Sequence, residues 1–183
     1  MGLIAPLSGA LAGSGQEMLA GARSFQRVHG DSVLGRPVQL FLKDSAGATP
    51  DAVRRMAQEL LDEKHVSFLM GFADDADVFA VAPLAGASHV PMLVMGAQGA
   101  DLTGRSRFVV RLSFTWAQVL APLARWAAQN GIRSAYTLAS GTAGGAHAEP
   151  AFRKACGDAG VLISGGERLA PEQRDFAGPL RHI

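Results

Sequence analysis

Apolar and polar residues follow two periods along this chain, one typical of strands and one typical of helices. Five short apolar runs predict strands, at residues 3–7, 38–43, 66–70, 91–95 and 108–112. Between them, apolar positions recur every three or four residues and predict amphipathic helices, at about 15–28, 49–63 and 77–87. This alternation indicates βα units and a mostly parallel sheet.

A second series of elements starts at residue 116. Only a short loop separates the fourth and fifth predicted strands, so the alternation skips a full helix there. The pattern then predicts a helix with its apolar face inward, a strand, a helix and a strand, at residues 116–129, 135–139, 149–159 and 161–164. We therefore expect a first lobe over residues 1–115 and a partial second lobe over residues 116–183.

Local signals mark several helix ends. Thr49 followed by Pro50 predicts an N-cap and a proline at the first helical position. Ser14, with Glu17 three residues later, predicts a capping box that opens the first helix. Gly131 is typical of the residue that follows a helix C-terminus.

Composition places the chain among ordinary globular proteins. Of its 183 residues, 48% are hydrophobic and 18% are charged, and the formal net charge is +1. This balance gives no electrostatic reason to expect nucleic acid or an anionic membrane as partner. The apolar runs are far shorter than the roughly 18 residues that cross a bilayer.

Residues that carry chemistry are sparse. The single cysteine, Cys156, excludes an internal disulfide and lies in a predicted helix, where a buried filler is expected. The five histidines are dispersed, no phosphate loop or Gly-x-Ser-x-Gly motif is present, and Met18 stands where a dinucleotide fingerprint needs its third glycine. We therefore predict no enzyme activity, no metal site and no cofactor.

Several short motifs follow one another in the order and spacing of one family. They are Ile4-Ala5-Pro6-Leu7-Ser8-Gly9, Gly35-Arg36-Pro37-Val38, Asp44, Thr49-Pro50, Ala82-Pro83-Leu84-Ala85, Val90-Pro91-Met92 and Phe108-Val109-Val110-Arg111. Over essentially its whole length, the chain resembles the N-terminal part of the leucine/isoleucine/valine-binding proteins of ABC transporters, which are type I periplasmic solute-binding proteins.

The resemblance implies an α/β fold of the periplasmic binding protein-like I class. Lobe 1 would hold a doubly wound parallel sheet, and an incomplete second α/β lobe would follow. The solute would bind in the cleft between lobes, and the protein would reside in the periplasm and deliver its solute to an ABC permease in the membrane. A family member is about twice this long, and the start lacks a basic and apolar leader, so we expect a fragment.

The resemblance also assigns candidate solute contacts. Asp74 and Asp75 lie in the loop that in the family is serine-rich and binds the solute carboxylate. Ala97 and Gln98 correspond to an Ala-Ser/Thr step with the same role, and Ser14 to a position that is often aromatic.

This sequence departs from the family pattern at these positions. Asp74, Asp75 and Gln98 replace hydroxyl groups, while Ser14 and Gly144 replace aromatic residues. Because carboxylates repel one another, we expect a cationic or neutral polar solute, such as an amide or a related amino acid, rather than a simple branched-chain amino acid.

Two of these features have a structural alternative. Asp74, Asp75 and Asp77 stand at a predicted helix start, where they can cap free N–H groups without any ligand. Trp116 can stack on a ligand near the junction of the lobes, or it can be the first core residue of its helix.

Two other functions remain open at this stage. A cytoplasmic ligand sensor on the same fold would explain the missing leader. A small flavodoxin-like enzyme or nucleotide binder would suit the length, but it would need a phosphate loop or a catalytic cluster after the strands.

Overall fold

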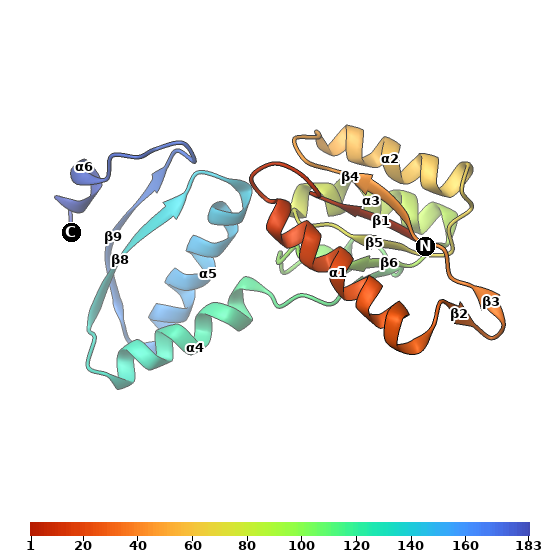
Figure 1. The fold of residues 1–183 in the computed structure, drawn as a ribbon. Coiled ribbons are helices and arrows are strands. Elements are labelled where there is room, and N and C mark those ends of the chain that lie inside the picture. Colours follow the sequence, from red (N-terminus) through yellow and green to blue (C-terminus); the bar gives the residue numbers. More distant parts are fainter. The chain divides into compact units, whose positions relative to one another are not determined.

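The computed structural model describes residues 1–183, apart from the side chain of Ala143, and it divides into two compact units. Unit 1 comprises Met1–Ala97 and Asp101–Ser113, and unit 2 comprises Gln98–Ala100 and Phe114–Ile183. Each unit has its own sheet and its own core, so each is described by itself (Figure 1).

Unit 1 is built on a parallel five-stranded sheet with the order β4-β1-β5-β6-β7. Its strands are β1 (Gly2–Ala5), β4 (Phe41–Asp44), β5 (Leu69–Gly71), β6 (Met92–Val94) and β7 (Val109–Arg111). Its helices are α1 (Ala12–His29), α2 (Pro50–Asp62), α3 (Asp75–Ser88) and the 3-10 turn η1 (Leu102–Gly104), and a hairpin joins β2 (Ser32–Val33) to β3 (Arg36–Pro37). Helices α2 and α3 pack together over one face of the sheet, and α1 lies on the other face (Figure 1).

The core of unit 1 lies between the sheet and the pair α2 and α3. Leu69, Met92 and Val109 stand in register on adjacent strands and are buried together. Leu60 of α2 is 1% exposed and packs close to the backbone of β1, where a Cβ at Gly2 would lie 2.8 Å from its Cδ1. The buried side chains of the strands and the apolar faces of α2 and α3 therefore pack together in one layer that excludes water.

Unit 2 consists of α4 (Trp116–Gln129), β8 (Ser134–Ser140), α5 (Ala143–Ala159), β9 (Leu162–Leu169) and α6 (Ala177–Leu180). Strands β8 and β9 pair in parallel, with an irregularity between Ala135 and Tyr136. Helices α4 and α5 pack on one another around a small core of Ala124, Ala127, Ala155, Cys156 and Val161. Cys156 is 0% exposed, which confirms that it fills core space.

The predicted α/β class and the parallel, doubly wound sheet are confirmed, but several element ends were wrong. Helix α5 begins at Ala143 and not at 149, because the Thr142 side chain caps it at the N–H of Gly145. Strand β9 continues to Leu169 instead of ending at 164. Strand β5 starts three residues later than expected, since the N–H of Val66 still bonds to the carbonyl of Leu60 in α2 and pairing with β6 begins at Leu69.

The sequence pattern predicts no element between α1 and β4, and the structure has the β2–β3 hairpin there. The inward face expected for α4 was also partly wrong. Val119 and Leu123 are 44% and 49% exposed, while Ala124 and Ala127 are buried. The reason is that α4 is covered along a narrow alanine stripe against α5, so only the middle of the predicted apolar face is enclosed.

Candidate functional site

The carboxyl ends of the parallel strands mark the candidate site of unit 1. In open α/β sheets ligands bind outside this edge, because loops from several strands converge there. The predicted solute contacts lie in the loops that follow β1, β5 and β6 or in the first turn of the next helix, and β4 ends at Asp44 beside the first of these loops.

Asp44 holds the loop after β1 in place. One carboxylate oxygen accepts from the N–H groups of Leu7 at 2.8 Å and Ala46 at 2.9 Å, and the other accepts from the Ser8 hydroxyl at 2.7 Å. The Ser8 hydroxyl, followed by these backbone N–H groups, lowers the pKa of Asp44 from its ordinary value. The side chain of Asp44 is thus fully used in ordering the backbone at this edge.

Ser14 lies near this loop but does not form the predicted capping box. Helix α1 begins at Ala12 with Leu11 as its N-cap residue, and no side chain caps it. The Ser14 hydroxyl donates to the carbonyl of Leu11 at 3.1 Å, so Ser14 is an exposed residue of the first turn. The second turn of the helix is tied to the loop, where Gln16 Nε2 donates to the carbonyl of Leu7 at 3.0 Å.

The loops after β5 and β6 are joined through one carbonyl. The oxygen of Phe72 accepts from the N–H groups of Gly96 at 3.2 Å and Ala97 at 3.0 Å. Phe72 has φ 62° and is 1% exposed, and Ala97 is 2% exposed within the same core. The methyl group of Ala97 therefore packs inward, and its backbone is bonded on both sides, since its carbonyl accepts from the Ser113 hydroxyl at 2.5 Å.

The three aspartates gather at the start of α3. Asp74 is the N-cap residue and accepts from the N–H of Ala76 at 2.8 Å, which confirms the capping role; its side chain is exposed. Asp75 is 7% exposed. Burial, followed by the charge of Asp74, raises the pKa of the half-buried Asp77 to about 6.

Gln98 belongs to unit 2, so the predicted step Ala97-Gln98 is divided between the units. The carbonyl of Gln98 accepts from the N–H of Trp116 at 3.3 Å. A capping box between Thr115 and Gln118 fixes the start of α4 at this point. Trp116 is half-buried and does not belong to the buried core of unit 2.

The start of α5 lies beside Trp116, which the sequence did not indicate. A Cβ placed on Gly144 would lie 3.8 Å from Trp116 Cζ2 and 3.8 Å from the Thr142 hydroxyl oxygen. At the next position, a Cβ on Gly145 would lie 1.9 Å from the carbonyl oxygen of Ser140, so only glycine fits. Gln98, Trp116, Thr142 and Gly144 thus form one group at the carboxyl end of β8.

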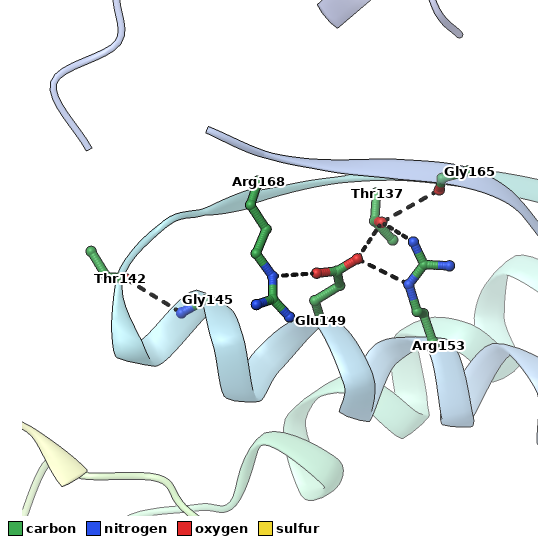
Figure 2. A network of polar contacts seen from close by, with 7 residues as sticks. All are labelled: Thr137, Thr142, Gly145, Glu149, Arg153, Gly165 and Arg168. Carbon is green, nitrogen blue, oxygen red and sulfur yellow. Dashed lines mark hydrogen bonds and ion pairs between the residues drawn. The ribbon is translucent and has the colours of Figure 1, made fainter. Parts of the chain in front are cut away.

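A polar network holds α5 on the sheet of unit 2 (Figure 2). Glu149 accepts from Arg153 Nε at 2.9 Å and from Arg168 Nε at 2.8 Å, and its side chain is 9% exposed. Thr137 Oγ1 lies 3.3 Å from Glu149 Oε1 and accepts from Arg153 at 3.2 Å. The hydrogen bonds from Arg168 and then Arg153 lower the pKa of Glu149.

A cavity of about 380 Å³ is lined by β8 and by the helices α4 and α5. Its apolar lining includes Leu120, Leu123 and Phe152, and its polar lining includes Glu149 and Thr137. Both polar groups already bond within the network, so the cavity presents a mainly apolar surface.

Among the described residues, no group of three or more His, Cys, Asp or Glu side chains is placed to hold a metal ion. Over the same described part of the chain, no helix combines the length and apolar character that a bilayer span requires.

A comparison with known protein families identifies the family of this chain. A family model described as "Periplasmic binding protein" matches residues 1–183. The chain belongs to the periplasmic binding protein family. This is a family of solute-binding proteins and not of enzymes, and the predicted resemblance is confirmed.

Similar proteins add detail to this assignment. "Leu/Ile/Val-binding protein homolog 6" of Brucella abortus (strain 2308) is 33% identical over 183 residues, covering 100% of this chain and 47% of that protein. The chain therefore spans about half the length of the curated relatives it matches. The alternative of a cytoplasmic sensor is not favoured by these matches.

Two solved structures resemble the chain closely. A solute-binding protein of an ABC transporter from Rhodopseudomonas palustris BisB5, in complex with 3,4-dihydroxybenzoic acid, is 36% identical with a TM-score of 0.90, over 99% of this chain and 50% of that one. Another from R. palustris HaA2, in complex with p-hydroxybenzoic acid, is 31% identical with a TM-score of 0.93, over 100% of this chain and 50% of that one.

Proposed function

We propose that this chain forms the N-terminal half of the substrate-binding component of an ABC-type uptake system in the periplasm. The observation that carries the proposal is the match of one family model to every residue of the chain. The expected lobes, residues 1–115 and 116–183, would each present loops at the carboxyl ends of their strands to the solute, and the membrane permease would be the protein partner.

We further propose that the solute is a small hydroxylated aromatic acid. The support comes from the two R. palustris proteins, which hold 3,4-dihydroxybenzoic acid and p-hydroxybenzoic acid and are more than 30% identical to this chain. Both ligands combine a planar ring, one carboxylate and at least one hydroxyl group.

The acidic residues at the start of α3 suit the hydroxyl end of such a molecule. Asp74 is exposed at this edge and uses one carboxylate oxygen to cap the N–H of Ala76. A phenolic hydroxyl donates a hydrogen bond to a carboxylate, whereas a solute carboxylate would be repelled by it. This orientation places the hydroxyl end of the solute at Asp74 and Asp75 and its charge elsewhere, and it replaces the sequence-based expectation of a cationic or neutral polar solute.

The loop after β6 supports the same arrangement. Gly96 lies in a crowded place, because a Cβ there would lie 2.6 Å from Met18 Cε and 3.0 Å from Cα of Ala73. The backbone of Gly96 therefore lies against the Met18 side chain of α1, the helix whose first turn holds the exposed Ser14. The solute contacts that we propose are Ser14, Asp74, Asp75, Ala97 and Gln98.

A ligand screen of the full-length gene product tests this function. We expect 4-hydroxybenzoate and 3,4-dihydroxybenzoate to raise the melting temperature, since a ligand that binds only the folded state stabilises it. Benzoate, which lacks the hydroxyl group, should raise the melting temperature less. Asp74→Asn should reduce the difference between the shifts that 4-hydroxybenzoate and benzoate produce. A melting temperature that is raised by leucine or by a cationic amine, but by no aromatic acid, would contradict the proposed solute. It would remain consistent with the proposed uptake function.

A further inference from the structure

We propose that Trp116 is a solute-binding residue whose ring forms an apolar wall against the aromatic ring of the solute, and that Gly144 keeps that wall open. This inference rests on the proposed function and names the residues of unit 2 that would recognise a planar ring. The sequence alone left Trp116 open between a core residue and a stacking residue.

The position of Trp116 is fixed by its backbone. It is the first residue of α4, directly after the N-cap Thr115, whose side chain accepts from the N–H of Gln118 at 3.1 Å. Its own N–H donates to the carbonyl of Gln98 at 3.3 Å. The backbone of Trp116 therefore lies beside that of Gln98, a predicted solute contact.

The indole does not serve the core of unit 2. That core consists of Ala124, Ala127, Ala155, Cys156 and Val161, with Ala121, Ala128, Ala135, Phe152, Ala159 and Ile163 packed against it, and Trp116 is in neither group. An indole that is only half-buried outside the core retains an apolar surface. A planar apolar ring is the solute surface that such a side chain complements best.

Gly144 has no steric reason of its own to be glycine. It is helical without positive φ, and the nearest atoms to an added Cβ, Trp116 Cζ2 and the Thr142 hydroxyl oxygen, would both lie at an ordinary 3.8 Å. Gly145 differs, because a Cβ there would lie 1.9 Å from the carbonyl oxygen of Ser140. Glycine at position 144 therefore leaves the edge of the Trp116 ring uncovered.

The resulting surface has the composition of a ring-binding site. It combines an aromatic wall from Trp116, a gap at Gly144, and the hydroxyl group of Thr142, which can donate to a polar substituent while its oxygen accepts from the N–H of Gly145. A simple aliphatic side chain would gain less from a flat aromatic wall than an aromatic ring does.

Fluorescence and calorimetry of the full-length gene product test the inference. Trp126 is 55% exposed on α4, so Trp126→Phe removes its emission without opening the core, and Trp116 then reports for this half of the protein. Any tryptophan outside this chain is replaced by phenylalanine in the same background. We expect 4-hydroxybenzoate to change the Trp116 emission. The Kd from this fluorescence titration should equal the Kd from calorimetry.

Substitutions give the second readout. We expect Trp116→Ala to weaken 4-hydroxybenzoate binding about tenfold, the size of one lost stacking contact, and Trp116→Phe to restore affinity to within about threefold of the parent. Gly144→Val, which covers the ring edge, should weaken binding by a similar factor. Gly157→Val is the matched control on the same helix, since an added Cβ there meets nothing within 4 Å, and it should leave the affinity unchanged.

The outcomes separate this inference from the proposed function. Tight binding of 4-hydroxybenzoate that survives Trp116→Ala and leaves the emission unchanged would overturn the role of Trp116 and keep the proposed solute. Failure to bind any aromatic acid, with binding of another solute class, would overturn both the proposed solute and the inference.

Discussion

The two βαβ segments of this chain, β1–α1–β4 in unit 1 and β8–α5–β9 in unit 2, share one close contact and differ in what surrounds them. In each, a glycine near the start of the helix lies against the end of the first strand. A Cβ would lie 2.0 Å from the carbonyl oxygen of Pro6 at Gly15, and 1.9 Å from that of Ser140 at Gly145. The same backbone approach therefore brings both helices close to the site edge.

The surroundings of the first strand differ. Strand β1 pairs with β4 and β5, and all four of its residues are buried. Strand β8 pairs with β9, and Thr137 is its one buried residue, held in the network of Glu149. Unit 1 is thus stabilised mainly by apolar burial and unit 2 to a larger degree by polar contacts, and this difference can be tested residue by residue.

The largest expected effect is the loss of a core leucine in unit 1. Leu60→Ala should lower the free energy of unfolding by about 4 kcal/mol, because the side chain is 1% exposed and its removal leaves a cavity. Leu162→Ala in unit 2 is the matched control, and at 68% exposed it should cost less than about 0.5 kcal/mol. Urea unfolding followed by circular dichroism measures both, and equal losses would refute the contrast.

The next effect concerns the shared glycine contact. Gly145→Ala should cost about 3 kcal/mol, because the new methyl group forces α5 away from the carbonyl of Ser140. Gly157→Ala, in the same helix but in open space, should gain up to about 1 kcal/mol from helix propensity. If thermal melts of the two variants coincide, α5 does not approach β8 as closely as described.

A smaller effect follows from Glu149. Its lowered pKa means that the carboxylate stabilises the fold above the ordinary value of 4.5, and that this stabilisation is lost as the pH falls through the lowered value. Glu149→Gln should therefore lower stability at pH 7, with the deficit shrinking at acidic pH. Glu59→Gln, from the exposed ion pair with Lys43, is the control and should show little change. A deficit that is constant with pH would argue against the ion pairs of Glu149.

The smallest effect concerns Asp77, whose pKa is raised to about 6. A raised carboxyl pKa means that folding favours the protonated form, so stability is lost as the pH rises from 3.8 through 6. Asp77→Asn removes this loss. The variant should gain at most about 1 kcal/mol in free energy of unfolding at pH 7 relative to pH 4, because solvent screens a half-buried group. Asp51→Asn, an exposed first-turn residue of α2, is the control. A gain that does not depend on pH would contradict the buried charge.

Local patterns were sufficient where an element carries its own end signals. Thr49 caps α2 at the N–H of Ala52, and α4 spans Trp116–Gln129 with Gly131 in the left-handed conformation beyond it, both as predicted. The same reasoning failed at α5, since Gly144 and Gly145 resemble a turn although Thr142 caps a helix there. It also failed at Ser14, where packing of the loop on α1 overrides the capping pattern.

For the candidate site too, some features could be predicted from the sequence and others could not. Asp74 follows a strand and precedes a helix, so its place at the carboxyl edge and its capping role could be inferred from the sequence. The approach of Trp116 to Gly144 joins residues 28 positions apart, and no local pattern encodes it. The burial of Ala97 likewise depends on the bond between its N–H and the distant carbonyl of Phe72.

Isothermal titration calorimetry of the full-length gene product with 3,4-dihydroxybenzoate, and with leucine in parallel, tests the central claim most directly. The account predicts saturable binding of the aromatic acid at one site per molecule, with no detectable heat from leucine. Binding of leucine at one site without binding of the aromatic acid would contradict it.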